Sequence, residues 1–139
     1  MPVVASSQKL RRLCLGLGLA IGLTSGLIHA AEASPVRVPA MLAGEWKITT
    51  VKFAAIYAAE PDEARHKVGK RAVFGSTSAE FAKAICTKPS YKQINDPELC
   101  AGEFFEIDCD NQTIMPSVCV SKGKASAELD GASFALRRK

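Results

Sequence analysis

Several segments after residue 40 show either alternating apolar and polar residues or a high content of β-branched and aromatic residues, and both patterns predict strands. Residues 46–53 (WKITTVKF) are rich in β-branched and aromatic side chains, which favour a strand. Residues 71–74 resume this pattern after a short interruption. Further along, residues 103–109 alternate in part, and residues 113–120 predict a strand interrupted by proline. The hydrophobic pattern therefore predicts a sheet.

The clearest hairpin lies near the end of the chain. Two alternating segments, ASAEL and ASFAL, flank Asp130 and Gly131. An Asp-Gly pair readily adopts the positive φ angles of a two-residue hairpin turn. The sequence therefore predicts two antiparallel neighbours at this end.

Two short segments have helical signals instead. Pro61, followed by acids and then by basic residues, predicts a helix over residues 61–68 that Gly69 ends. Thr77 and Glu80 stand at capping-box spacing, and Phe81 and Ile85 lie four residues apart, which predicts a second helix over residues 78–86. A further turn is expected at residues 96–98.

These elements together predict an α+β fold that is mainly β. We expect a small antiparallel meander of about six to eight strands with two short helices, stabilised by disulfides. Because a sheet must protect its edges, closure into a barrel is the expected end state.

The first part of the chain has the pattern of a secretory signal peptide. Three basic residues precede an apolar run, residues 13–31, which ends in small residues with Ala31-Glu32-Ala33 as an A-x-A exit. We expect residues 1–33 to be removed, with cleavage after Ala30 or Ala31 as close alternatives and an uncleaved membrane anchor as the other interpretation. Residues 34–41, with two prolines, then form an extended lead-in, and residues 42–139 form one domain. The expected location is periplasmic or secreted.

Cleavage also changes the charge of the protein. The full chain has a formal net charge of +4, and a chain that begins at Ser34 keeps fifteen basic and thirteen acidic residues, or about +2. This balance gives no broad basic surface for nucleic acid. We expect a monomer without membrane contact once the signal is gone.

Four cysteines remain after cleavage: Cys86, Cys100, Cys109 and Cys119. An even number in a small exported domain predicts two disulfides. Of the three possible pairings, Cys86–Cys100 with Cys109–Cys119 closes the shortest loops and is the one we favour. No C-x-x-C pair is present and His66 is the nearest histidine, so we expect no metal site.

Gly44 and Trp46 place a Gly-x-Trp motif at the start of the first expected strand. This motif resembles the opening of lipocalin-like barrels, in which the Trp closes one end and a basic residue near the last strand covers it. The resemblance implies that Trp46 and Arg137 form this structural pair, an arrangement that a cation–π contact would stabilise.

Residues 36–46 also resemble the start of bacterial secreted inhibitors of alkaline metalloproteases, which are small lipocalin-like barrels. In that family an extended N-terminal segment enters the protease cleft. The resemblance implies that Arg37 and Val38 contact a protein partner. The middle of the chain, with its four cysteines, departs from that family's pattern.

No catalytic motif is present in the sequence. His66 lies between charged residues, where a solvated surface position is expected, and the acids around residues 103–110 lack calcium-loop spacing. We therefore expect a non-enzymatic protein without a cofactor that binds another protein, with an inhibitor of a secreted or host hydrolase as the favoured form. The alternative is a small-ligand carrier with a lipocalin-like pocket.

Overall fold

Nine antiparallel strands and one short helix make up the described fold. A computed structural model of the chain describes residues 36–56 and 60–139, which belong to one compact unit. The expected signal peptide, residues 1–33, and the first two residues of the lead-in lie outside the described residues. The elements are β1 (Gly44–Phe53), α1 (Pro61–Lys67), β2 (Arg71–Phe74), β3 (Ser78–Phe81), β4 (Ala84–Thr87), β5 (Ser90–Ile94), β6 (Glu103–Asp108), β7 (Ser117–Ser121), β8 (Lys124–Leu129) and β9 (Ala132–Arg138).

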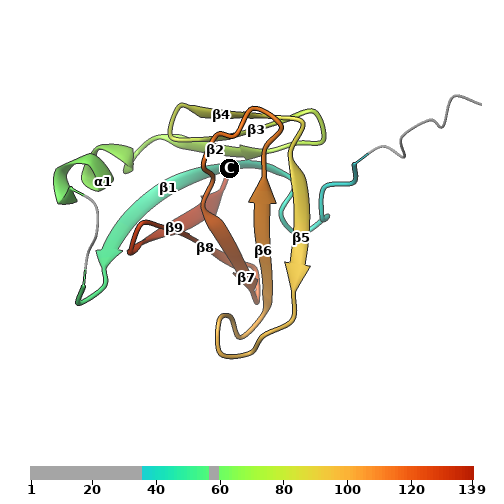
Figure 1. Ribbon diagram of the computed structural model, residues 1–139. Helices are drawn as coiled ribbons and strands as arrows, with labels where there is room; N and C mark the ends of the chain where they lie inside the picture. Colours follow the sequence, from blue (N-terminus) through green and yellow to red (C-terminus); the bar gives the residue numbers. More distant parts are fainter. Residues whose placement is uncertain (1–35, 57–59) are drawn as a thin grey trace, which may run out of the picture. The chain divides into compact units, whose positions relative to one another are not determined.

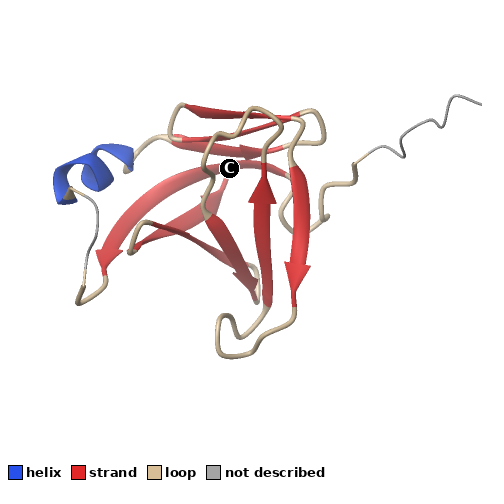
Figure 2. Ribbon diagram, in the orientation of Figure 1, coloured by secondary structure: helices blue, strands red, loops and turns tan. Residues whose placement is uncertain are grey.

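The strands form a single sheet in the order β4-β3-β2-β1-β9-β8-β7-β6-β5. β1 and β9, the first and last strands, are neighbours at its centre, and every other neighbouring pair is consecutive in the order of the strands along the chain. Figures 1 and 2 show that the sheet curls strongly, so that β2, β3 and β4 turn over the side formed by β1 and β9. The mainly β meander predicted from the sequence is confirmed.

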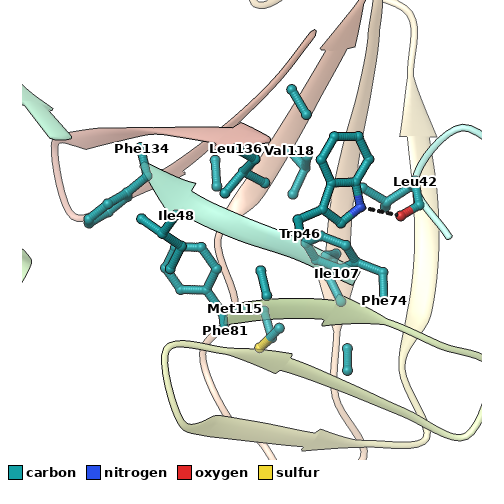
Figure 3. Packing of buried hydrophobic residues seen from close by; sticks show 14 of the residues in the cluster. Leu42, Trp46, Ile48, Phe74, Phe81, Ile107, Met115, Val118, Phe134 and Leu136 are labelled. Atoms are coloured by element: carbon teal, nitrogen blue, oxygen red, sulfur yellow. Dashed lines mark hydrogen bonds between the residues drawn. The ribbon is translucent and has the colours of Figure 1, made fainter. Parts of the chain in front are cut away.

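The inner face of the curled sheet carries the hydrophobic core. Alternate residues of each strand point inward, so that most strands read as buried and exposed positions in turn. Large side chains from strands distant in sequence meet there, as Phe81 and Phe134 do with ring centroids 5.4 Å apart (Figure 3). The largest fully buried aromatic side chains are Trp46, Phe74, Phe81, Phe105 and Phe134.

The helix expected near residue 61 is confirmed as α1 (Pro61–Lys67), with acids in its first turn and basic residues in its last. Ala64 is its buried residue, and the Arg65 guanidinium lies 5.4 Å from the centre of the Phe53 ring on β1. These contacts place α1 beside the end of β1.

The second expected helix, residues 78–86, is wrong. This segment forms the β3–β4 hairpin, in which Ala79 and Phe81 are buried while Ile85 is 57% exposed. Ala82 and Lys83 take positive φ angles of 49° and 80° and reverse the chain. The burial of alternate residues on a sheet therefore overrides the helical spacing of Phe81 and Ile85.

The hydrogen-bonded ladder does not close into a barrel, since no ladder joins the edge strands β4 and β5 in the described part of the chain. Other contacts protect the β4 edge instead. The side-chain amide of Asn111 accepts a hydrogen bond from the Thr87 N–H at 3.2 Å and donates one to the Ile85 carbonyl at 2.9 Å. Asn111 thus pairs with β4 much as a neighbouring strand would.

Two disulfides are present, as expected, but the favoured pairing is wrong. Cys86 bonds to Cys109 and Cys100 bonds to Cys119. The first bond links β4 to the residue after β6, beside Asn111. The second links the β5–β6 connection to β7, where Cys119 lies opposite Phe104. The curled sheet brings these pairs together across its strands, which loop length alone could not indicate.

Candidate functional site

Trp46 lies near one end of the central strands β1 and β9. The indole is 1% exposed, and its Nε1–H donates a hydrogen bond of 2.9 Å to the Leu42 carbonyl (Figure 3). The guanidinium of Arg138 lies over the indole, 4.3 Å from its centre. The structure therefore contains a capped Trp at the start of the first strand.

The residue that covers Trp46 is Arg138 and not Arg137, which corrects the expected pair. Trp46 lies directly opposite Arg138 in the β1–β9 register, while Arg137 lies opposite Lys47. Because side chains alternate between the faces of a strand, a shift of one residue moves Arg137 to the outer face. Only the register, which the sequence does not reveal, distinguishes the two arginines.

The lead-in is fixed at its base by Arg138. Its two terminal nitrogens donate hydrogen bonds to the Ala43 carbonyl at 2.8 Å and the Met41 carbonyl at 2.7 Å. A tight turn adds to this, because the N–H groups of Leu42 and Ala43 both donate to the Pro39 carbonyl. One side chain thus caps the core and holds the base of the lead-in.

The described residues of the lead-in differ in exposure. Arg37 is exposed, as its expected role in binding requires, whereas Val38 is partly buried and packs against the core. Val36, which was not among the expected contacts, is 42% exposed. We call residues 36–40 the arm; its accessible side chains include Val36 and Arg37.

A hollow of about 450 Å³ lies beside the base of the arm. Met41, Trp46 and Arg138 form one side of it, and residues of the β5–β6 connection and the β7–β8 turn form the other. Gly102 permits this arrangement: a Cβ there would overlap the Val120 carbonyl oxygen and lie 2.8 Å from the Ser121 Cα. The base of the arm and the hollow together form the candidate binding site.

The electrostatics near this end are those of surface ion pairs. Lys139 lies 2.6 Å from the Glu45 carboxylate, and its hydrogen bond and charge lower the pKa of Glu45. Such a pair orders the last residues of β9 but contributes little to stability.

The candidate catalytic groups are not brought together. His66 is exposed on α1, far along the chain from the strand that carries Glu103, Glu106 and Asp108. Among residues 36–56 and 60–139, no group of three or more histidines, cysteines or carboxylates could hold a metal ion. The same residues include no helix that could span a membrane.

In comparisons with known proteins, no family profile, no curated protein and no solved structure matches this chain.

Proposed function

We propose that this chain is an exported binding protein that holds another protein with its N-terminal arm, and that it acts as an inhibitor of a hydrolase. The observation that carries the proposal is the contrast within the arm. Its base is fixed by Arg138 and by the turn at Pro39, while Val36 and Arg37 are exposed beyond that base. A segment whose base is already ordered loses less entropy when a partner binds it.

The filled core favours a protein partner over a small ligand. Five aromatic side chains that are at most 1% exposed occupy the inner face of the sheet, where a lipocalin-like carrier would need an open cavity. The hollow beside the arm lies at the surface and is partly formed by the arm's own base. Both features support binding by the arm and its surroundings.

Two disulfides support a location outside the cytoplasm. Both bonds are formed in the structure, and disulfides persist in oxidising compartments. This agrees with the signal-peptide pattern of residues 1–33, so the proposed site of action is the periplasm or the medium.

The test compares the chain that begins at Ser34 with a variant that lacks residues 34–40. Both proteins are assayed against a panel of secreted metalloproteases and other hydrolases. We expect inhibition by the complete mature chain and loss of inhibition without the arm. Arg37→Glu should weaken inhibition, whereas Lys92→Glu, an exposed change on β5, should not.

Near-ultraviolet circular dichroism of Trp46 controls for folding in each variant. If the arm-deleted protein is folded and inhibits as well as the complete chain, the arm is not the binding segment. If a purified mature chain inhibits no hydrolase but carries a small apolar molecule, the carrier function replaces the proposal.

A further inference from the structure

Four basic residues form a line across the outer face of the sheet, and we call them the cation row: Arg71 on β2, Lys47 on β1, Arg137 on β9 and Lys124 on β8. Lys47 lies directly opposite Arg71 on one side and Arg137 on the other. Ala125 lies opposite Leu136, so the same ladder places Lys124 beside Arg137. The four strands are consecutive neighbours in the sheet (Figure 1).

The cation row faces solvent along its whole length. All four of its residues are exposed, whereas one sequence neighbour of each is buried on the inner face: Trp46, Ala72, Ala125 and Leu136. The alternation of the strands therefore places every charge of the row on one outer surface.

Three residues of the row have no acidic partner in the part of the chain that the structure describes. Arg71 lies 2.6 Å from Glu80, and the nearby Glu45 is bonded to Lys139. Lys47, Arg137 and Lys124 form no ion pair within the described residues. Like charges placed directly opposite each other destabilise a sheet, so the fold gains nothing from these three.

A second hollow, of about 420 Å³, adjoins the Lys124 end of the row on β7, β8 and β9. Lys122 and Lys124 lie at its rim, and the hydroxyl-bearing residues Ser121 and Ser126 line it together with Ala135. These small side chains allow a partner to approach the sheet closely. The cations and hydroxyls could hold a carboxylate that enters the hollow.

We propose that the outer face of β1, β9 and β8 binds an acidic peptide segment of a partner protein, with its carboxylates on Lys47, Arg137 and Lys124. This inference rests on the proposed function as a protein-binding module and adds the chemistry of the partner. The arm and the cation row are then two separate contacts, one through the exposed side chains of the arm and one through unpaired positive charge.

The surroundings of the row favour a peptide over an anionic membrane. Membrane attachment through a few cations is weak unless an apolar group is inserted as well. None of the large hydrophobic residues that are exposed in the described part of the chain lies on β1, β2, β8 or β9, the four strands that carry the row. These exposed residues are Val36, Met41, Ile56, Ile85, Leu99 and Ile114.

The experiment measures binding of a fluorescent poly-glutamate peptide to the chain that begins at Ser34. The test variant is Lys47→Glu with Arg137→Glu, and the control is Lys88→Glu with Lys92→Glu, which changes the net charge equally at exposed positions on the β4–β5 connection and on β5. We expect the test variant to bind about ten-fold more weakly, since two ion pairs are lost and two repulsions appear. The control should bind nearly as well as the original chain, and added salt should reduce its binding.

Thermal unfolding separates loss of binding from loss of folding. The test variant places two new acids directly opposite each other, so a single Lys47→Glu variant is measured as well. This single change replaces the like-charge contacts of Lys47 with Arg71 and Arg137 by opposite-charge contacts, and the protein should unfold at a higher temperature than the original chain. We expect weaker peptide binding together with higher stability, because the charges of the cation row serve binding and not folding.

Three results would overturn the inference: equal binding by the test variant, an equal loss in the control variant, or binding to phosphatidylglycerol vesicles but not to the peptide. The variant lacking residues 34–40 is measured in parallel. If it binds the peptide but inhibits no hydrolase, the arm and the row act separately; failure of the peptide alone leaves the arm's function standing.

Discussion

Arg137 and Arg138 are adjacent in sequence, equally basic and both exposed, yet they lie on opposite faces of β9. Arg138 stacks on Trp46 and donates hydrogen bonds to two carbonyls of the chain before β1. Arg137 lies beside Lys47 on the outer face and forms no ion pair within the described residues. One of them stabilises the fold, and the other is available to a partner.

Replacing Arg138 with Ala should lower the free energy of unfolding by about 2 kcal/mol, because a cation–π contact and two charge-assisted hydrogen bonds are lost at a partly exposed site. Arg137→Ala is the matched control and should leave stability unchanged or slightly raised, since it removes a like-charge contact with Lys47. Urea denaturation followed by Trp46 fluorescence measures both. Equal losses in the two variants would contradict the roles assigned to these arginines.

At the scale of single elements, the sequence predicts strands well where burial alternates and poorly where turn residues are unusual. Asp130 and Gly131, at φ angles of 50° and 79°, form the turn that their residue types predict, between β8 and β9. Ala82 and Lys83 form a similar turn between β3 and β4, although neither is typical of positive φ. The helix expected at residues 78–86 failed at this turn, because no local signal marks it.

The protection of the β4 edge is an element-scale property that rests on Asn111. Its amide is bonded to both the N–H of Thr87 and the carbonyl of Ile85, and the Thr113 hydroxyl donates to the same carbonyl at 2.9 Å. Exposed Ile85 lies on this strand, so an uncovered edge would offer both backbone and apolar surface to another chain.

Asn111→Ala should therefore lower the free energy of unfolding by about 1–2 kcal/mol, through two lost hydrogen bonds, and should promote self-association at the β4 edge. Gln112→Ala, an exposed change at the next residue, is the control and should do neither. Urea denaturation and light scattering at increasing protein concentration measure the two effects. A monomeric Asn111→Ala protein of unchanged stability would show that the disulfide beside it protects the edge alone.

At the scale of the whole described unit, the sequence predicted the class of fold and the presence of two disulfides, but not how the sheet curls. Cys86 and Cys109 are adjacent in space because β4 and the end of β6 meet across the open side of the sheet. Of the two contacts that the resemblance implied, Arg37 is exposed and Val38 is partly buried. The cation row depends on the register of four strands, which the sequence does not reveal. Long-range strand pairing decides both the disulfide pairing and the cation row, and local sequence patterns do not indicate that pairing.

Tyr91 bridges the open side of the sheet at a point where no ladder does. Its hydroxyl, on edge strand β5, donates a hydrogen bond of 2.7 Å to the Gly75 carbonyl between β2 and β3. Burial raises the pKa of Tyr91 to about 12 from an ordinary value of 10.0. Ionisation of this phenol removes the donated proton and leaves a charge in a partly buried position.

The sign of the pH dependence follows from the raised pKa. The folded protein holds the phenolic proton more tightly than the unfolded chain, so the contribution of Tyr91 to stability is complete below about pH 10 and is lost as the pH rises towards 12. Tyr91→Phe lacks this group and should be about 1 kcal/mol less stable at neutral pH, because the bond to Gly75 is missing. The stability difference between the two proteins should then shrink above pH 10, as measured by urea denaturation at a series of pH values. A difference that stays constant up to pH 12 would mean that folding does not raise the pKa of Tyr91. The two edges of the sheet would then be held together by the Cys86–Cys109 disulfide and Asn111 rather than by this hydroxyl.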